Sequence, residues 1–114
     1  MTACLFCKIV DRTIQSTMVY EDEHAVAFQD LHPQAPVHIL VIPKRHIQSV
    51  QDSPDSDAPL MGHLLMVCGK LAKQKGISES GYRIVTNTGP HAGQTVHHLH
   101  FHLLGGRSLT WPTG

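Results

Sequence analysis

Polar and apolar residues alternate near the C-terminus, in the run His97-His98-Leu99-His100-Phe101-His102-Leu103-Leu104. From His98 onward the period is two, which predicts a strand because successive strand side chains point to opposite faces. We call His98, His100 and His102, which fall on one face, the histidine row. We expect this face to carry chemistry and the apolar face to close a core.

Four further apolar runs predict strands. Residues Met18–Glu21 and Ala25–Asp30 flank an acidic turn and predict a hairpin. Residues 37–42 are β-branched and apolar apart from His38, and Pro43 ends the run, as expected for a strand that is buried on both faces. The last of the four strands is predicted over Tyr82–Thr86.

Two stretches have helical spacing. Between Cys4 and Asp11, apolar residues three and four apart predict a short helix. Asp57 and Pro59 are helix-start signals, and an amphipathic stripe runs from there to a stop at Gly76. Strands in hairpin order around one long helix predict an α+β fold, with about five strands in a mostly antiparallel sheet and both helices on one face. A chain of 114 residues is expected to be a single domain, residues 1–114.

Charge narrows the expected partners. Lys and Arg together number 9, as do Asp and Glu, so no basic field predicts binding to nucleic acid or to an anionic membrane. No apolar run approaches a membrane span and no signal-peptide pattern follows Met1, so we expect a cytoplasmic protein. The unusual count is 10 His.

Imidazole titrates near neutrality, so a row of histidines can supply a nucleophile, a metal ligand or a proton donor. The loop from Thr88 to Thr95 precedes the row and contains Gly89 and Gly93. Backbone N–H groups in such a loop can cradle phosphate oxygens, although most glycine-containing loops are ordinary turns. Beside three imidazoles, the loop predicts an anion site next to a nucleophile.

Cys4 and Cys7 form a Cys-x-x-Cys pair, which is half of a tetrahedral zinc site. His46 and one histidine of the row are candidates for the other two ligands. The alternative is a pair of ordinary core cysteines on a short helix. Cys68 lies in the stripe of the long helix and is expected to be a core residue.

Together these residues resemble the histidine triad (HIT) superfamily, whose motif His-φ-His-φ-His-φ-φ fits residues 98–104. Gly105-Gly106-Arg107 and Trp111-Pro112 are similar to its Hint branch. Other segments resemble that branch in the same order, so the resemblance covers nearly the whole chain: Phe28-Gln29-Asp30, residues 33–38, residues 41–46 and residues 87–95.

The resemblance implies a HIT-like fold and a homodimeric hydrolase. Its substrates would be purine nucleoside phosphoramidates, such as adenosine monophosphoramidate or lysine-linked AMP, and aminoacyl-adenylates. His100 would be the nucleophile that forms a nucleotidyl-histidine, His102 would contact the phosphate and protonate the leaving amine, and His38 would assist the proton relay. The implied nucleotide-binding residues are Asp30 for the ribose, Leu5, Phe6, Ile9, Phe28 and Leu31 for the nucleoside, and Asn87, Gly93, Gln94 and Thr95 for the phosphate.

Members of the branch that have both cysteines resemble zinc-binding proteins. The resemblance therefore implies a structural zinc ion, with no organic cofactor, on these ligands: Cys4, Cys7, His46 and His98.

The sequence departs from the branch at His97, where tyrosine is common, and at Thr95, where serine is common. Two other hypotheses stay open, namely a hydrolase that uses the histidine row as ligands of a catalytic metal and a nucleotide-binding interaction module with incidental turnover. The late Trp111 is compatible with a tail that packs near a partner's site.

Overall fold

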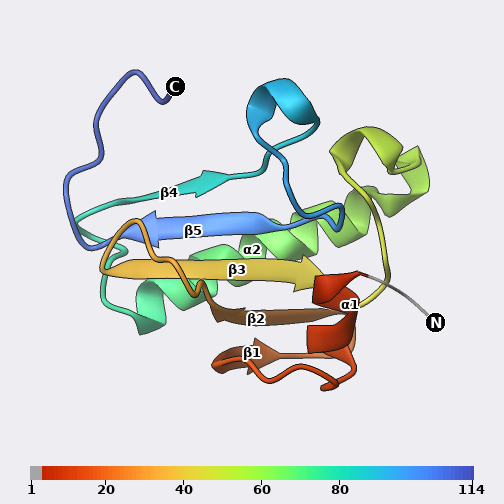
Figure 1. Cartoon of the computed structure of the whole chain (residues 1–114). Coiled ribbons are helices and arrows are strands. Elements are labelled where there is room, and N and C mark those ends of the chain that lie inside the picture. The colour runs from red at the N-terminus through yellow and green to blue at the C-terminus, as the bar shows by residue number, and fades with distance from the viewer. Residues whose placement is uncertain (1–3) are drawn as a thin grey trace.

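A five-stranded sheet forms the centre of the molecule (Figure 1). The structure, a computed structural model, describes residues 4–114. Neighbouring strands are all antiparallel, in the order β1-β2-β3-β5-β4. The predicted α+β class and five-stranded sheet are thereby confirmed. The strands are β1 (Met18–Glu21), β2 (Ala25–Gln29), β3 (Val37–Pro43), β4 (Tyr82–Val85) and β5 (Phe101–Gly105).

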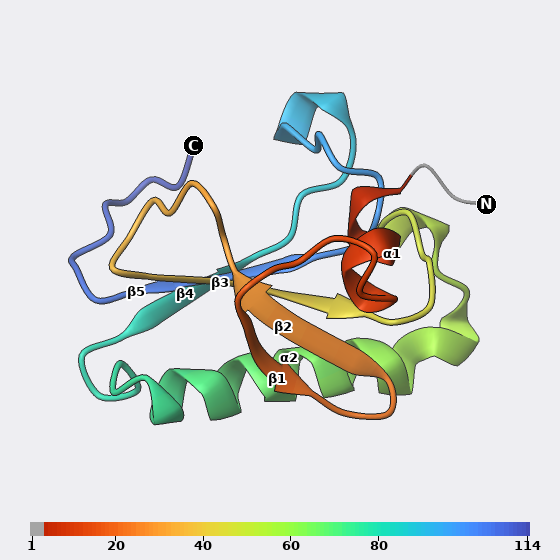
Figure 2. The same cartoon turned by 60° about the horizontal axis from the view of Figure 1, so that its bottom comes forward.

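The two α-helices pack on opposite faces of this sheet (Figure 2). Helix α2 (Ala58–Gln74) covers one face, where it joins the main core with Ile39 and Val41. Helix α1 (Leu5–Val10) lies on the other face, where Phe6 and Ile9 join a second core with residues of β2 and β3. The expectation that both helices share one face is therefore wrong. Strands β2 and β3 are apolar on both sides, so each side needs its own cover.

Helix α2 follows its sequence signals closely. Pro59 lies in its first turn, and the chain leaves the helix through Gly76, whose φ of 73° is a left-handed conformation that suits glycine. Cys68 is fully buried in the main core, as predicted, and burial raises the pKa of its thiol to about 12. Within residues 4–114, no helix is long and apolar enough to cross a membrane.

Strand β5 is shorter than the alternating pattern predicts. It begins at Phe101, so His98 and His100 precede the strand instead of lying in it. The ladder between β3 and β5 ends at the pair Val41–Phe101, close to Pro43, which has no N–H to donate. Upstream of Phe101, the N–H of Leu99 bonds instead to the carbonyl of Ile47, in the loop after β3, at 2.6 Å. The apolar face of the pattern is nevertheless kept, because Leu99, Phe101 and Leu103 all lie in the main core.

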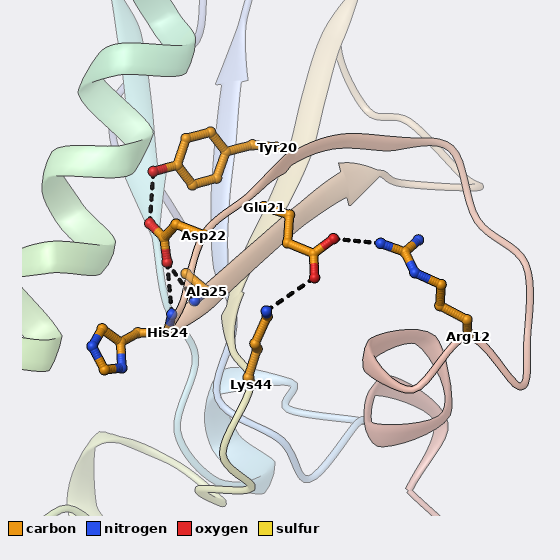
Figure 3. A network of polar contacts seen from close by, with 7 residues as sticks. All are labelled: Arg12, Tyr20, Glu21, Asp22, His24, Ala25 and Lys44. Carbon is orange, nitrogen blue, oxygen red and sulfur yellow. Dashed lines mark hydrogen bonds and ion pairs between the residues drawn. The ribbon is translucent and has the colours of Figure 1, made fainter.

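A polar network closes the β1–β2 hairpin (Figure 3). The Asp22 carboxylate accepts hydrogen bonds from the Tyr20 hydroxyl at 2.6 Å and from the N–H groups of His24 and Ala25 at 2.8 Å each. The neighbouring Glu21 forms ion pairs with Lys44, at 2.9 Å, and with Arg12, which follows α1. These contacts join the end of the α1 segment to the first strand.

Candidate active site

The histidine row lies on the face of the sheet that carries α1. His98 is fully buried and His100 is nearly so, whereas His102 is half-buried on β5. The ring of His100 lies with its centroid 5.0 Å from that of His102 and 5.0 Å from that of Phe6, which α1 supplies. The fold therefore brings the row together with the short helix.

A backbone carbonyl sets the tautomer of His100. Its Nδ1 lies 2.7 Å from the carbonyl oxygen of His98. A carbonyl oxygen only accepts, so Nδ1 must carry the proton and donate it. In the neutral ring, Nε2 then keeps its lone pair, which is the form an imidazole nucleophile needs.

A second hydrogen-bond chain orders His38 and His102. The N–H of Gln34 donates to Nδ1 of His38 at 3.0 Å, so the proton of the neutral His38 ring is on Nε2. That Nε2 lies 2.9 Å from Nδ1 of His102 and 3.4 Å from Oδ2 of Asp30. With Nδ1 accepting from His38, the neutral ring of His102 carries its proton on Nε2. The chain is thus directed from Gln34 through His38 to His102.

Burial favours the neutral form of these histidines. Loss of solvation is the largest cause that lowers the pKa of His38 and of His100, opposed in both by the negative charge of Asp30. It is also the largest cause for His102, where positive charge on His100 or His38 adds to it and lowers the pKa to about 4. The site of the free protein therefore holds neutral rings at neutral pH.

Arg107 holds the loop that supplies the Gln34 N–H group. Its guanidinium donates from Nε and Nη2 to the carbonyl oxygen of Gln34, at 3.1 and 2.8 Å. The adjacent Gly106 has a φ of 90°, and a Cβ atom there would lie only 2.9 Å from Cβ of Pro36 in the same loop. The Gly-Gly-Arg segment after the histidine row therefore fixes the backbone group that orients His38.

The glycine-containing loop before the row is held by Gln94. Its side-chain oxygen accepts from the N–H of Gly89 at 2.9 Å, and its amide nitrogen donates to the carbonyl of Gln48 at 2.8 Å. Gly89 and Gly93 both have a φ of 82°. The side chain of Gln94 is therefore occupied within the protein, and the backbone N–H groups of Gly89, Ala92, Gly93 and Gln94 also bond within the loop. The N–H groups of His91 and Thr95 are left as the backbone donors that could hold an anion.

The four predicted zinc ligands meet at one end of the row. The Sγ atom of Cys4 lies 3.3 Å from Nδ1 of His98, and that of Cys7 lies 3.3 Å from Nδ1 of His46. The two Nδ1 atoms are 3.2 Å apart. A tetrahedral zinc ion with ordinary bond lengths separates its ligand atoms by roughly 3.3 to 3.8 Å. These four residues, which we call the Cys2His2 cluster, therefore fit a zinc ion.

The hydrogen bond of His98 Nε2 orients the ring so that Nδ1 can bind a metal ion. Its Nε2 lies 2.9 Å from the carbonyl oxygen of Pro43 and must donate to it, which leaves the Nδ1 lone pair directed at the cluster. A hydrogen bond from the second nitrogen is the usual way in which a metal-binding histidine is oriented. The same residue accepts from His100 through its backbone carbonyl. His98 therefore links the cluster to the proposed nucleophile.

The remaining predicted nucleotide-binding residues surround the row at different depths. Phe6, Ile9 and Phe28 are buried in the second core, whereas Leu5 and Leu31 are 44% and 84% exposed. Asn87 lines an open cavity of about 890 Å³ together with His38, His102 and the exposed Trp111. Leu5 and Thr95 line a separate one of about 500 Å³. Both cavities have walls that include residues of the proposed site.

The whole chain is similar to proteins of one family. The HIT domain model matches residues 11–109. The chain belongs to the HIT domain family. A HIT-like protein of Synechococcus elongatus is 54% identical over 110 residues, which are 96% of each chain. A HIT family hydrolase of Legionella pneumophila is 50% identical with a TM-score of 0.96, covering 97% of this chain and 99% of that one. A histidine triad nucleotide-binding protein of Candida albicans is 33% identical with a TM-score of 0.82, covering 98% and 85%.

Sequence patterns missed the backbone groups that order this HIT site. The carbonyls of Pro43 and His98 and the N–H of Gln34 each fix one ring nitrogen, and no residue type signals a backbone contact. Thr86 was also missed, although its hydroxyl donates to the carbonyl of His100 at 2.9 Å. Arg107 could have been found, because it belongs to the Gly-Gly-Arg segment that follows the row.

Proposed function

We propose that this HIT protein is a purine nucleoside phosphoramidase, which hydrolyses the P–N bond of AMP-amines and also accepts aminoacyl-adenylates. The observation that carries the proposal is the bond of His100 Nδ1–H to the His98 carbonyl, which leaves Nε2 as a free nucleophile. The HIT family hydrolase of Legionella pneumophila, a close structural relative, supports a hydrolytic role.

In the first step, Nε2 of His100 attacks the α-phosphorus and the P–N bond breaks, which gives a nucleotidyl-histidine and an amine. The leaving nitrogen needs a proton, and His102 is the proposed donor. Although its pKa is about 4 in the free protein, a phosphate anion bound beside the ring raises this pKa and favours the imidazolium. When His102 is protonated, its Nδ1–H donates to Nε2 of His38, so the bond between the two rings reverses and the proton of His38 moves to Nδ1. Donation from Nε2 to the leaving amine then leaves His102 neutral, with its proton on Nδ1 and a lone pair on Nε2.

In the second step, water attacks the phosphorus of the nucleotidyl-histidine. Neutral His102 takes a proton from that water, the P–Nε2 bond breaks, and AMP leaves with His100 regenerated. The backbone N–H and the hydroxyl of Thr95, in the loop before the row, are proposed to stabilise charge on the non-bridging oxygens. Asp30, with an oxygen 3.4 Å from Nε2 of His38, is the proposed acceptor for the ribose hydroxyls. The proposed base and phosphate contacts are those named above from the resemblance.

The test is hydrolysis of adenosine 5′-phosphoramidate by the purified protein. We expect AMP release, its loss in His100→Ala, and a wild-type adduct heavier by one AMP after a quench in alkaline denaturant, in which the P–N bond of the adduct survives. His97→Ala is the matched control, because His97 is exposed and next to the row but outside it, and it should retain turnover. AMP binding with no turnover of any adenylylated amine would instead favour the nucleotide-binding module.

The catalytic-metal hypothesis has one observation in its favour. Asp30, His38 and His102 place ligand atoms within 4.8 Å of one another. However, the Gln34 N–H occupies Nδ1 of His38, so its Nε2 keeps a proton and has no lone pair for an ion. A proton relay therefore suits this group better than metal binding. Asp30→Asn should leave the metal content unchanged.

We further propose that the Cys2His2 cluster holds one structural zinc ion per chain. Two thiolates and two imidazoles at these spacings are a donor set that zinc prefers. An ion there would join α1 to the segments that follow β3 and precede β5. Elemental analysis of protein purified without chelators should find about one zinc per chain, and Cys7→Ser should lose it.

Homodimerisation in the cytoplasm completes the proposal. Strand β4 lies at an edge of the sheet, and Trp111 is 81% exposed on a tail beside the cavity that His102 lines. Both features suit a second copy packing against this side. Sedimentation velocity should give the mass of a dimer, and a monomer at all concentrations would remove this part of the proposal.

A further inference from the structure

Helix α1 is too short to be stable by itself. It has 6 residues, whereas isolated helices need roughly 12 to 15 residues to persist in water. Its N-cap is Cys4, whose Sγ accepts from the N–H of Cys7 at 3.4 Å. Beyond its far end, Arg12 pairs with Glu21 (Figure 3), but the two side chains are 59% and 37% exposed, and ion pairs open to solvent contribute little. The helix therefore depends on tertiary contacts at its buried side and at its N-terminus.

The Cys2His2 cluster supplies the contacts at the N-terminus. Cys4 and Cys7 come from the cap and first turn of α1, while His46 and His98 come from segments 39 and more residues away in the chain. An ion on all four ligands would cross-link α1 to the segment that follows β3 and to the segment that precedes β5. Without the ion, the buried side of the helix rests mainly on Phe6 and Ile9.

The same helix forms a wall of the nucleophile's site. The Phe6 ring meets the His100 ring edge-to-face, with centroids 5.0 Å apart and an angle of 89° between planes. It also lies 6.0 Å from the ring of His98 and 5.4 Å from that of Phe28. A shift of α1 would thus remove a packing partner from His100.

A second route runs through His98. One ring nitrogen of His98 joins the cluster, the other donates to Pro43, and its backbone carbonyl accepts from His100. A ligand that holds the His98 ring therefore also holds the carbonyl that sets the tautomer of His100. Two independent contacts, from Phe6 and from His98, connect the cluster to the same imidazole.

We propose that metal binding at the Cys2His2 cluster and nucleotide binding at His100 are thermodynamically coupled, so that the cluster regulates the site through α1 and His98. The inference rests on the proposed nucleotide site. When the ion is lost, α1 samples displaced positions, and nucleotide binding then includes the cost of ordering it again. Metal ions should therefore strengthen nucleotide binding, and the nucleotide should strengthen metal binding by the same factor.

Calorimetric titrations test this reciprocity with Zn²⁺ and AMP as probes. We expect the Kd of AMP to rise by about fivefold or more when the protein is stripped of metal, and the Kd of Zn²⁺ to rise by the same factor when AMP is absent. Equal AMP affinity with and without Zn²⁺ would overturn the coupling while leaving the nucleotide site intact. Failure of AMP to bind in either state would overturn the nucleotide site and the coupling together.

Hydrogen exchange separates this coupling from a general loss of stability. In metal-stripped protein and in His46→Ala, amides of residues 8–11 should exchange faster while those of β3 and β5 stay protected. His97→Ala is the control, because it removes an exposed histidine beside the cluster without removing a ligand. Exchange that accelerates equally in α1, β3 and β5, or that stays unchanged in α1, contradicts the proposal.

Discussion

Acid should destabilise this fold through His102, and replacing that residue should remove part of the effect. In the folded protein, burial and the charges of His100 and His38 lower the pKa of His102 from 6.5 to about 4. Between these values the unfolded chain binds a proton that the folded chain excludes. Stability from this group is therefore complete above about pH 6.5 and falls as the pH falls.

The size of the effect follows from the two pKa values. Linkage gives a loss of about 2 kcal/mol in the free energy of unfolding between pH 7 and pH 5 for a group that shifts from 6.5 to about 4. The pKa of His38 is lowered as well, so the wild-type protein should lose more than this in total. Any acid release of metal from the cluster adds to the total but is common to the wild type and a His102 variant.

The assay is urea unfolding of the wild type and of His102→Gln at a series of pH values from 8 to 5. Subtracting the free energy of unfolding of His102→Gln from that of the wild type at each pH isolates the contribution of His102. This difference should fall by about 2 kcal/mol from pH 7 to pH 5. His24→Gln is the matched control, because the His24 side chain is 64% exposed. Parallel curves for the wild type and His102→Gln would refute the reasoning that His102 is held neutral by its surroundings.

Two further predictions concern the Gly-Gly-Arg segment. Arg107→Lys cannot form the two hydrogen bonds that Arg107 donates to the Gln34 carbonyl, so we expect roughly a tenfold lower kcat/KM and altered ¹⁵N ring shifts of His38 by NMR. The control is Arg45→Lys, which changes an exposed arginine paired with Asp57 and should change neither quantity. An unaltered His38 tautomer in Arg107→Lys would argue against the positioning role of Arg107. Gly106→Ala should lower the free energy of unfolding by roughly 1–3 kcal/mol, because the φ of Gly106 is 90° and the new Cβ would lie 2.9 Å from Pro36. The control is Gly62→Ala, whose new Cβ would meet nothing within 4 Å and which should not be destabilising. Equal changes in the free energy of unfolding for the two variants would contradict this account.

Hydrophobic periodicity predicted the elements whose burial is simple. Helix α2 has one apolar stripe with a start signal at Pro59 and a stop at Gly76, and β3 is an apolar run that ends at Pro43. The buried stripe of α2 faces the main core, and from Ile39 to Ile42 each side chain of β3 faces one of the two apolar cores. The pattern of apolar residues therefore coincides with the pattern of burial, and the sequence of the segment alone is enough to predict the element.

Periodicity failed where the neighbours change along an element. The alternation that begins at His98 continues into β5, but the strand starts only at Phe101 because the ladder with β3 ends there. The sequence of α1 also does not predict which face of the sheet the helix covers. Its two buried residues, Phe6 and Ile9, specify an apolar partner, and both faces of β2 and β3 offer one.

The roles of the histidines depend on backbone groups that the sequence pattern does not show. In the pattern, His98, His100 and His102 are three equivalent residues on one face. In the fold, the Pro43 carbonyl takes the Nε2 proton of His98, the His98 carbonyl takes the Nδ1 proton of His100, and Nδ1 of His102 accepts from His38. The free nitrogen is consequently Nδ1 in His98, directed at the cysteines, and Nε2 in His100. Identical side chains at equal spacing thus acquire different chemistry because each meets a different hydrogen-bonding partner, and this is why family resemblance could suggest their roles while periodicity alone could not.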